Sequence, residues 1–276
     1  MKPSDFPPDS SLPTGARLVE ATRHTGGGNT AEAVAIAEEV PIALVFNGIS
    51  HAVMMATPAD LEHFALGFAL SEGIIDDAAA CRDMQLVSRG DAGTEVQMEI
   101  GSREFARLKE RRRSLAGRTG CGLCGVDSLV ALELDAGTVR RPDWSRRLGF
   151  DAITAGMAAM SSRQALNART GGVHAAAWLL PDGSAVHVAE DVGRHNALDK
   201  LLGWLALQRR AGDAPEGFAA VSSRASFELV RKCARLDVPA LAAISAPTAL
   251  AVQLARQSGM ALLAFCRPAG MTLFAA

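Results

Sequence analysis

The chain has 276 residues, of which 49% are hydrophobic and 21% charged, so it can bury the core of one large or two modest domains. A formal net charge of −2 argues against a protein that coats nucleic acid or binds membranes through charge. Met1 is followed by a polar, proline-rich stretch, which predicts a disordered tail over residues 1–16 and a cytoplasmic protein without a signal peptide. The most apolar span, residues 238–255, is interrupted by two prolines and predicts no membrane segment.

The first part of the chain shows strand patterns followed by helix patterns. Residues 32–40 and 42–57 alternate in polarity and carry an Asn47-Gly48 turn signal, which predicts antiparallel strands. Thr57 is the expected cap of a following helix that Gly73 ends. A second hairpin around residues 89–93 and a basic helix follow. These elements predict a small α+β domain over residues 17–115.

Residues 118–125 read RTGCGLCG and place Cys121 and Cys124 in a glycine-rich segment. Such a pair can contribute half a zinc site, form a redox disulfide or carry a transferable sulfur atom, and the motif alone leaves all three open. No second pair with metal-ligand spacing exists, so we expect no bound metal. The glycines predict a mobile loop over residues 116–128. The basic residues that precede the pair would favour a thiolate: Arg103, Arg107, Lys109, Arg111, Arg112, Arg113 and Arg118.

The remaining three cysteines are isolated in or beside apolar segments. Cys81, Cys233 and Cys266 are expected to behave as small buried hydrophobic residues. The five cysteines therefore do not predict a secretory disulfide framework.

Beyond the cysteine pair, apolar runs alternate with helical periods, which is typical of an α/β domain. We predict that this domain covers residues 129–276. The expected strands are 173–180, 217–221, 238–244 and 260–265, and the expected helices are 152–169, 193–209, 225–236 and 248–258.

Four turns in this domain combine polar groups with the start of a helix or the end of a strand. In residues 190–200, EDVGRHNALDK, Asp191 is a candidate helix cap, and Arg194 and His195 are candidate donors to an anion. Arg224 follows one apolar strand, and Ser245 and Thr248 follow the next. Parallel strands would bring these turns to one edge of a sheet, where nucleotides commonly bind. Arg267, after the last apolar run, could meet a pyrophosphate.

The motifs RTGCGLCG, TGGVHAA, EDVGRHNALDK, SRASFELV and SAPTALAV occur in an order that closely resembles the formate dehydrogenase accessory sulfurtransferases, the FdhD/NarQ family. The resemblance implies a C-terminal three-layer α/β domain similar to the cytidine deaminase fold. It also implies that Cys121 bears a persulfide and that Cys124 is its companion. The family's cofactor-binding stretch matches Phe265, Cys266, Arg267, Pro268, Ala269 and Gly270.

The resemblance further implies a sulfurtransferase that takes persulfide sulfur from a cysteine desulfurase. The sulfur would pass to the molybdenum or tungsten bis(molybdopterin guanine dinucleotide) cofactor of formate dehydrogenase. A guanine nucleotide would mimic that cofactor, and the protein would be a homodimer without nucleic-acid or membrane partners.

Two other classes of protein are alternatives to this interpretation. A zinc deaminase would need a His-x-Glu motif before a Pro-Cys-x-x-Cys motif, whereas His174 is followed by two alanines and the cysteine pair precedes it. A non-catalytic cofactor chaperone would use the same pocket as a sulfur carrier, so the sequence leaves it open.

Overall fold

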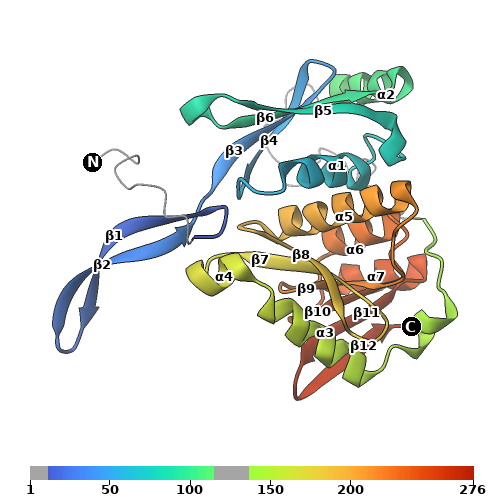
Figure 1. Ribbon diagram of the computed structural model, residues 1–276. Helices are drawn as coiled ribbons and strands as arrows, with labels where there is room; N and C mark the ends of the chain where they lie inside the picture. Colours follow the sequence, from blue (N-terminus) through green and yellow to red (C-terminus); the bar gives the residue numbers. More distant parts are fainter. Residues whose placement is uncertain (1–11, 115–136) are drawn as a thin grey trace.

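The computed structural model describes residues 12–114 and 137–276, and Figure 1 shows them as stacked layers of sheets and helices. The first half contains β1 (Ala16–Thr25), β2 (Gly28–Ala37), β3 (Val40–Phe46), β4 (Ile49–Ala56), α1 (Leu61–Ser71), η1 (Ala78–Ala80), β5 (Cys81–Ser88), η2 (Gly90–Ala92), β6 (Thr94–Ile100) and α2 (Ser102–Ser114). The second half contains η4 (Asp143–Arg147), α3 (Phe150–Ser162), α4 (Ala165–Thr170), β7 (His174–Leu179), β8 (Ala185–Asp191), α5 (Arg194–Ala211), β9 (Phe218–Val221), α6 (Phe227–Arg235), β10 (Ala240–Ala243), α7 (Ala249–Ser258), β11 (Ala261–Arg267) and β12 (Gly270–Ala275).

The N-terminal half forms a two-stranded ribbon and a four-stranded sheet. Among the described residues, strands β1 and β2 pair only with each other and project from the body in Figure 1, whereas the larger sheet has the order β4-β3-β6-β5. The predicted turn between β3 and β4 is confirmed, with Asn47 and Gly48 both at positive φ. Part of the predicted tail is wrong, because β1 already begins at Ala16; residues 1–11 of that tail lie outside the described residues.

Helix α1 begins later than its sequence suggests. Its N-cap residue is Asp60, in a left-handed conformation, and not Thr57. Thr57 is completely buried, and its hydroxyl accepts a hydrogen bond from Val192 N at 3.2 Å. The predicted cap was wrong because this hydroxyl is used by a segment far away in the sequence.

The C-terminal half is a mixed six-stranded sheet with the order β12-β11-β10-β9-β7-β8. Strands β9, β10 and β11 are parallel, and β7, β8 and β12 add antiparallel pairings, with β8 and β12 absent from the predicted strands. Side chains alternate between the two faces: Ala175, Ala177 and Leu179 pack towards α3, whereas Ala176 and Trp178 pack towards α5. The predicted α/β class with a helix layer on each face of this sheet is therefore confirmed.

The single helix predicted over residues 152–169 is wrong, since α3 ends at Ser162 and α4 starts at Ala165. The Glu190 carboxylate at the end of β8 accepts hydrogen bonds from Leu166 N and Asn167 N at 2.9 and 2.8 Å. These bonds satisfy free backbone donors of a new helix start, which stabilises the break.

Helices α1 and α5 lie alongside each other, with their backbones in close contact at Gly67 and Gly203, and join the two halves (Figure 1). A Cβ atom added to Gly67 would lie 1.8 Å from Asp199 O, and one added to Gly203 would lie 1.9 Å from His63 O. One continuous cluster of buried side chains consequently runs from β3 to β12.

Buried charged side chains also lie where the two halves meet, between α1, α5 and α6. Lys232 Nζ lies 2.8 Å from both Glu72 Oε1 and Asp199 Oδ2, and it donates to Ser71 Oγ at 2.8 Å. Although burial acts to raise the pKa of Glu72, Lys232 and Arg231 lower it to about 2. Glu72 is therefore a carboxylate at neutral pH and holds α1 against α6.

Candidate functional site

The predicted turns after β9 and β10 lie next to each other at one edge of the six-stranded sheet. Ala225 and Pro247 form a parallel bridge, in which Ala225 N donates to Ala246 O at 3.2 Å and Thr248 N donates to Ala225 O at 3.0 Å. The turn after β11 joins them, because Phe265 N donates to Ser245 O at 3.2 Å. Parallel strand ends thus bring Arg224, Ser245, Thr248 and Phe265 to one edge, as predicted.

The side chains of this edge differ in their availability to a ligand. Arg224 is exposed, and Thr248 is the N-cap residue of α7, where its hydroxyl accepts a hydrogen bond from Ala251 N at 3.3 Å. Arg267 is also exposed, and its Nε donates to Ile244 O at 3.4 Å. Each arginine therefore has donors left for an anion at the edge.

Phe265 has unusual geometry. It adopts a left-handed conformation with φ of 54° and is 42% exposed, with its ring centroid 6.1 Å from that of Phe274. A large residue in this region is strained, and such strain is common where a side chain serves a ligand. The neighbouring Cys266 side chain is buried against the α3 face, and burial raises the pKa of its thiol to about 11. Pro268 and Ala269 form the turn that leads to Gly270 and β12.

The start of α5 corrects one sequence prediction. The N-cap residue is Gly193, not Asp191. Asp191 is completely buried, and its carboxylate accepts hydrogen bonds from Thr57 N at 3.0 Å, Gly193 N at 2.8 Å and Asn196 Nδ2 at 3.0 Å. The carboxylate therefore fixes the turn from within, beneath the residues that face outward.

Arg194 and His195 lie at this turn. Two residues that were not predicted as site residues, Glu228 and His174, lie beside them. His195 Nε2 contacts the Glu228 carboxylate on α6, and this hydrogen bond is the main cause of the lowered pKa of Glu228. At the start of β7, burial, Arg194 and His195 lower the pKa of His174. Both missed residues lie inside motifs already quoted, TGGVHAA and SRASFELV, but only the structure shows that they face Arg194 and His195.

Two buried polar atoms beside this cluster have no hydrogen-bond partner within residues 12–114 and 137–276: Arg194 Nε and Ser226 Oγ. Ser226 is the N-cap residue of α6, and its side chain does not cap the helix. Buried polar groups are normally satisfied, so these atoms are suited to a water or a ligand. The edge can thus present cationic and hydroxyl donors to an anionic group, while Glu228 orients the His195 ring.

Cys121 and Cys124 lie outside the described residues. The other three cysteines are buried and unpaired, as predicted, and burial is the main cause of the raised pKa of each thiol. Across the part of the chain that the structure describes, no group of three or more His, Cys, Asp or Glu side chains could hold a metal ion. Within the same residues, no helix is both long and apolar enough to cross a membrane.

The sequence model of the FdhD/NarQ family matches residues 37–276. The chain belongs to this family. A sulfur carrier protein FdhD from Chromobacterium violaceum is 51% identical over 95% of this chain and 96% of its own length, and one from Burkholderia mallei is 49% identical over 92% and 93%. A solved structure of a formate dehydrogenase accessory protein from Desulfotalea psychrophila is 24% identical and has a TM-score of 0.71, over 95% of this chain and 97% of that one. This last match confirms the FdhD/NarQ fold, whereas similarity to cytidine deaminases stays a prediction.

Proposed function

We propose that this chain is a sulfur carrier that takes persulfide sulfur from a cysteine desulfurase and delivers it to the cofactor of formate dehydrogenase. The observation that carries the proposal is the match, over 95% of the chain, to a relative named as a sulfur carrier protein. The glycine-rich segment with Cys121 and Cys124 agrees with it, because a carrier needs an accessible thiol. The protein acts in the cytoplasm as a homodimer.

In the loading step, the Cys121 thiolate attacks the outer sulfur of the donor's cysteine persulfide. A new S–S bond forms on Cys121, the donor's S–S bond breaks, and the donor cysteine leaves as a thiolate. In delivery, the outer sulfur leaves Cys121, which keeps a thiolate, and the reduced metal of the client cofactor supplies the two electrons that make the sulfur a sulfido ligand. Cys124 either relays the sulfur or resolves the persulfide as a disulfide.

The client is a molybdenum or tungsten bis(molybdopterin guanine dinucleotide), and its nucleotide end binds the edge formed by the turns after β9, β10 and β11. Arg224 and Arg267 supply donors to the diphosphate, and the exposed ring of Phe265 offers a face for stacking on the base. The cluster of Arg194, His195 and Glu228 is the second polar part of this site.

Intact-mass analysis after incubation with a cysteine desulfurase and cysteine tests the sulfur-carrier proposal. We expect a gain of about 32 Da, one sulfur atom, that a reductant removes. A chain that binds guanine nucleotides but never gains this mass, while still activating formate dehydrogenase, would instead be a non-catalytic cofactor chaperone.

A further inference from the structure

The outer part of the β1–β2 ribbon projects from the body of the protein (Figure 1), and every residue from Thr22 to Ala31 is exposed. Its base, by contrast, includes half-buried residues such as Val19 and Val34, and α4 contacts both strands. A two-stranded hairpin without further cover is only marginally stable in water. The outer ribbon therefore needs cover that residues 12–114 and 137–276 of the same chain do not supply.

The edges of the ribbon lack the features that normally prevent a strand from pairing with another chain, which include lysine, proline and bulges. The edge strands of the two larger sheets, β4, β5, β8 and β12, all have register shifts in the pairing with their neighbours. The ribbon pairs without a shift from Ala16 with Ala37 to Thr25 with Gly28, and residues 16–37 contain neither lysine nor proline. Its strand edges are therefore open to pairing.

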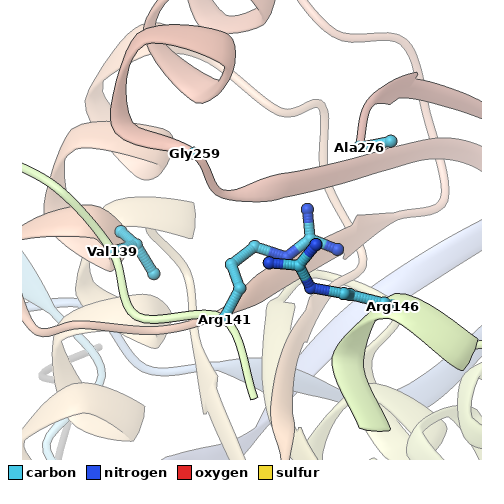
Figure 2. A pocket seen from close by; sticks show the side chains of 5 residues that line it. All are labelled: Val139, Arg141, Arg146, Gly259 and Ala276. Carbon is cyan, nitrogen blue, oxygen red and sulfur yellow. The ribbon is translucent and has the colours of Figure 1, made fainter. Parts of the chain in front are cut away.

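The shape of the ribbon favours another protein chain over a small ligand. Small ligands bind in hollows, and the hollow shown in Figure 2 is lined by residues outside the ribbon: Val139, Arg141, Arg146, Gly259 and Ala276. A projecting ribbon instead presents strand edges, whose backbone groups bind an extended segment of another chain by forming a further strand.

A second copy of this chain offers a strand that matches the edge in length and regularity. The charged residue of β2 is Glu32, and its carboxylate accepts a hydrogen bond from Arg23 Nε at 2.7 Å within the ribbon. Two β2 strands can consequently lie side by side without repulsion between unpaired like charges. A stable interface uses about 20–30 residues on each side, and residues 16–37 supply most of that number.

We propose that the exposed part of β2 pairs with β2 of a second copy, antiparallel across a two-fold axis, so that the two ribbons form one continuous sheet. This assignment rests on the homodimer of the proposed function and places its interface. In a two-fold dimer each copy presents the same surface, so one free edge on each chain is enough to close the assembly.

Light scattering after size-exclusion chromatography tests the assignment. We expect the wild-type protein to have twice the chain mass of 28.8 kDa. The double variant Ala31→Lys/Ala33→Lys should have the mass of a single chain, because lysines at these exposed positions of β2 would bring like charges together between the copies. Deletion of residues 16–37 should do the same. It joins Gly15 to Glu38, whose backbone groups are already hydrogen-bonded at 2.7 Å.

The matched control is Ala106→Lys/Ala158→Lys, which adds the same charges at exposed alanines on α2 and α3 and should keep the wild-type mass. A dimer that persists in both ribbon variants overturns this assignment but not the homodimer, and so does a control that dissociates equally. A wild-type monomer overturns both. If that monomer also lost formate dehydrogenase activation in the lysine variant, the ribbon would instead bind the client enzyme. Sulfur loading is read from a different mass change, so the carrier role is tested independently.

Discussion

Lys200 Nζ lies 2.8 Å from Asp191 Oδ2, and both side chains are completely buried. The ammonium group also donates to Thr57 O and Glu190 O, each at 3.1 Å, so it has a partner for each of its three protons. Lys200→Met would leave a buried carboxylate without its cation. We expect a loss of about 3–5 kcal/mol in the free energy of unfolding, measured with urea.

Lys109→Met is the control for this measurement. Lys109 is exposed on α2 and lies 4.6 Å from the ring centroid of Phe105, so its loss should cost under about 1 kcal/mol. Equal stabilities of the two variants would show that the buried pair contributes nothing at the junction.

Gly203→Ala tests the close contact between α1 and α5. The added Cβ would meet His63 O at 1.9 Å, and a backbone atom at that distance can move only if the helices separate. We expect a loss of about 1–3 kcal/mol or failure to fold, read from the thermal unfolding midpoint. Gly149→Ala places a methyl group where nothing lies within 4 Å and should unfold at the wild-type midpoint.

His187 gives stability a predictable dependence on pH. Its ring stacks on Trp204 with centroids 4.6 Å apart, and burial, followed by His63, lowers its pKa from 6.5 to about 4. Nearby Asp60 opposes this shift and Arg163 adds to it. The unfolded chain takes up the proton first, so stability should fall as the pH drops from about 6.5 to about 4.

The check is His187→Phe, which keeps an aromatic ring beside Trp204 but does not titrate. The variant should lose part of the slope of unfolding free energy against pH in this range. An unchanged slope would assign the dependence to other groups.

Arg224→Gln tests the nucleotide edge. We expect GDP to bind the variant about tenfold more weakly than the wild-type chain, since a charge-assisted bond to the diphosphate is lost. Arg169→Gln, an exposed arginine on α4, should bind GDP as the wild-type chain does. Calorimetry that finds no GDP binding to the wild-type chain would refute the proposed placement.

The five cysteines should separate by reactivity. Burial raises the pKa of Cys81, Cys233 and Cys266, so these side chains stay protonated and poorly nucleophilic in the folded protein. Alkylation at neutral pH should modify only Cys121 and Cys124, whereas the unfolded chain should be modified at all five positions.

Cys121→Ala should lose both persulfide loading and formate dehydrogenase activation in a complementation strain. Cys266→Ala should keep both, at a cost of about 1 kcal/mol in stability. A Cys121→Ala chain that still gained one sulfur atom and activated the enzyme would contradict the carrier role of Cys121.

Local patterns predicted much of this fold because helix and strand periods depend on neighbouring residues. The strands at 218–221 and 240–243 and the helix at 194–211 all lie within or near the predicted ranges. The break before α4 was missed, since it depends on Glu190, 24 residues from Leu166. Such long-range hydrogen bonds leave no periodic signal.

At the candidate site too, contacts between residues far apart in the chain could not be predicted from the sequence. EDVGRHNALDK is rich in polar residues, but these have two different roles in the structure. Asp191 and Lys200 face inward and hold Thr57, whereas Arg194 and His195 lie nearer the surface. Sequence alone could not separate these two roles, because Thr57 lies 134 residues from Asp191 along the chain.

The contact between α1 and α5 also sets an order of events during synthesis. Ser71 on α1 donates a hydrogen bond to Asp199 on α5 across 128 residues of sequence. At roughly 5–20 residues per second, a ribosome needs on the order of 6–26 s to make that length of chain. Until then α1 has no α5 to cover it, so the apolar face that α1 buries in the folded protein stays exposed on the nascent N-terminal half.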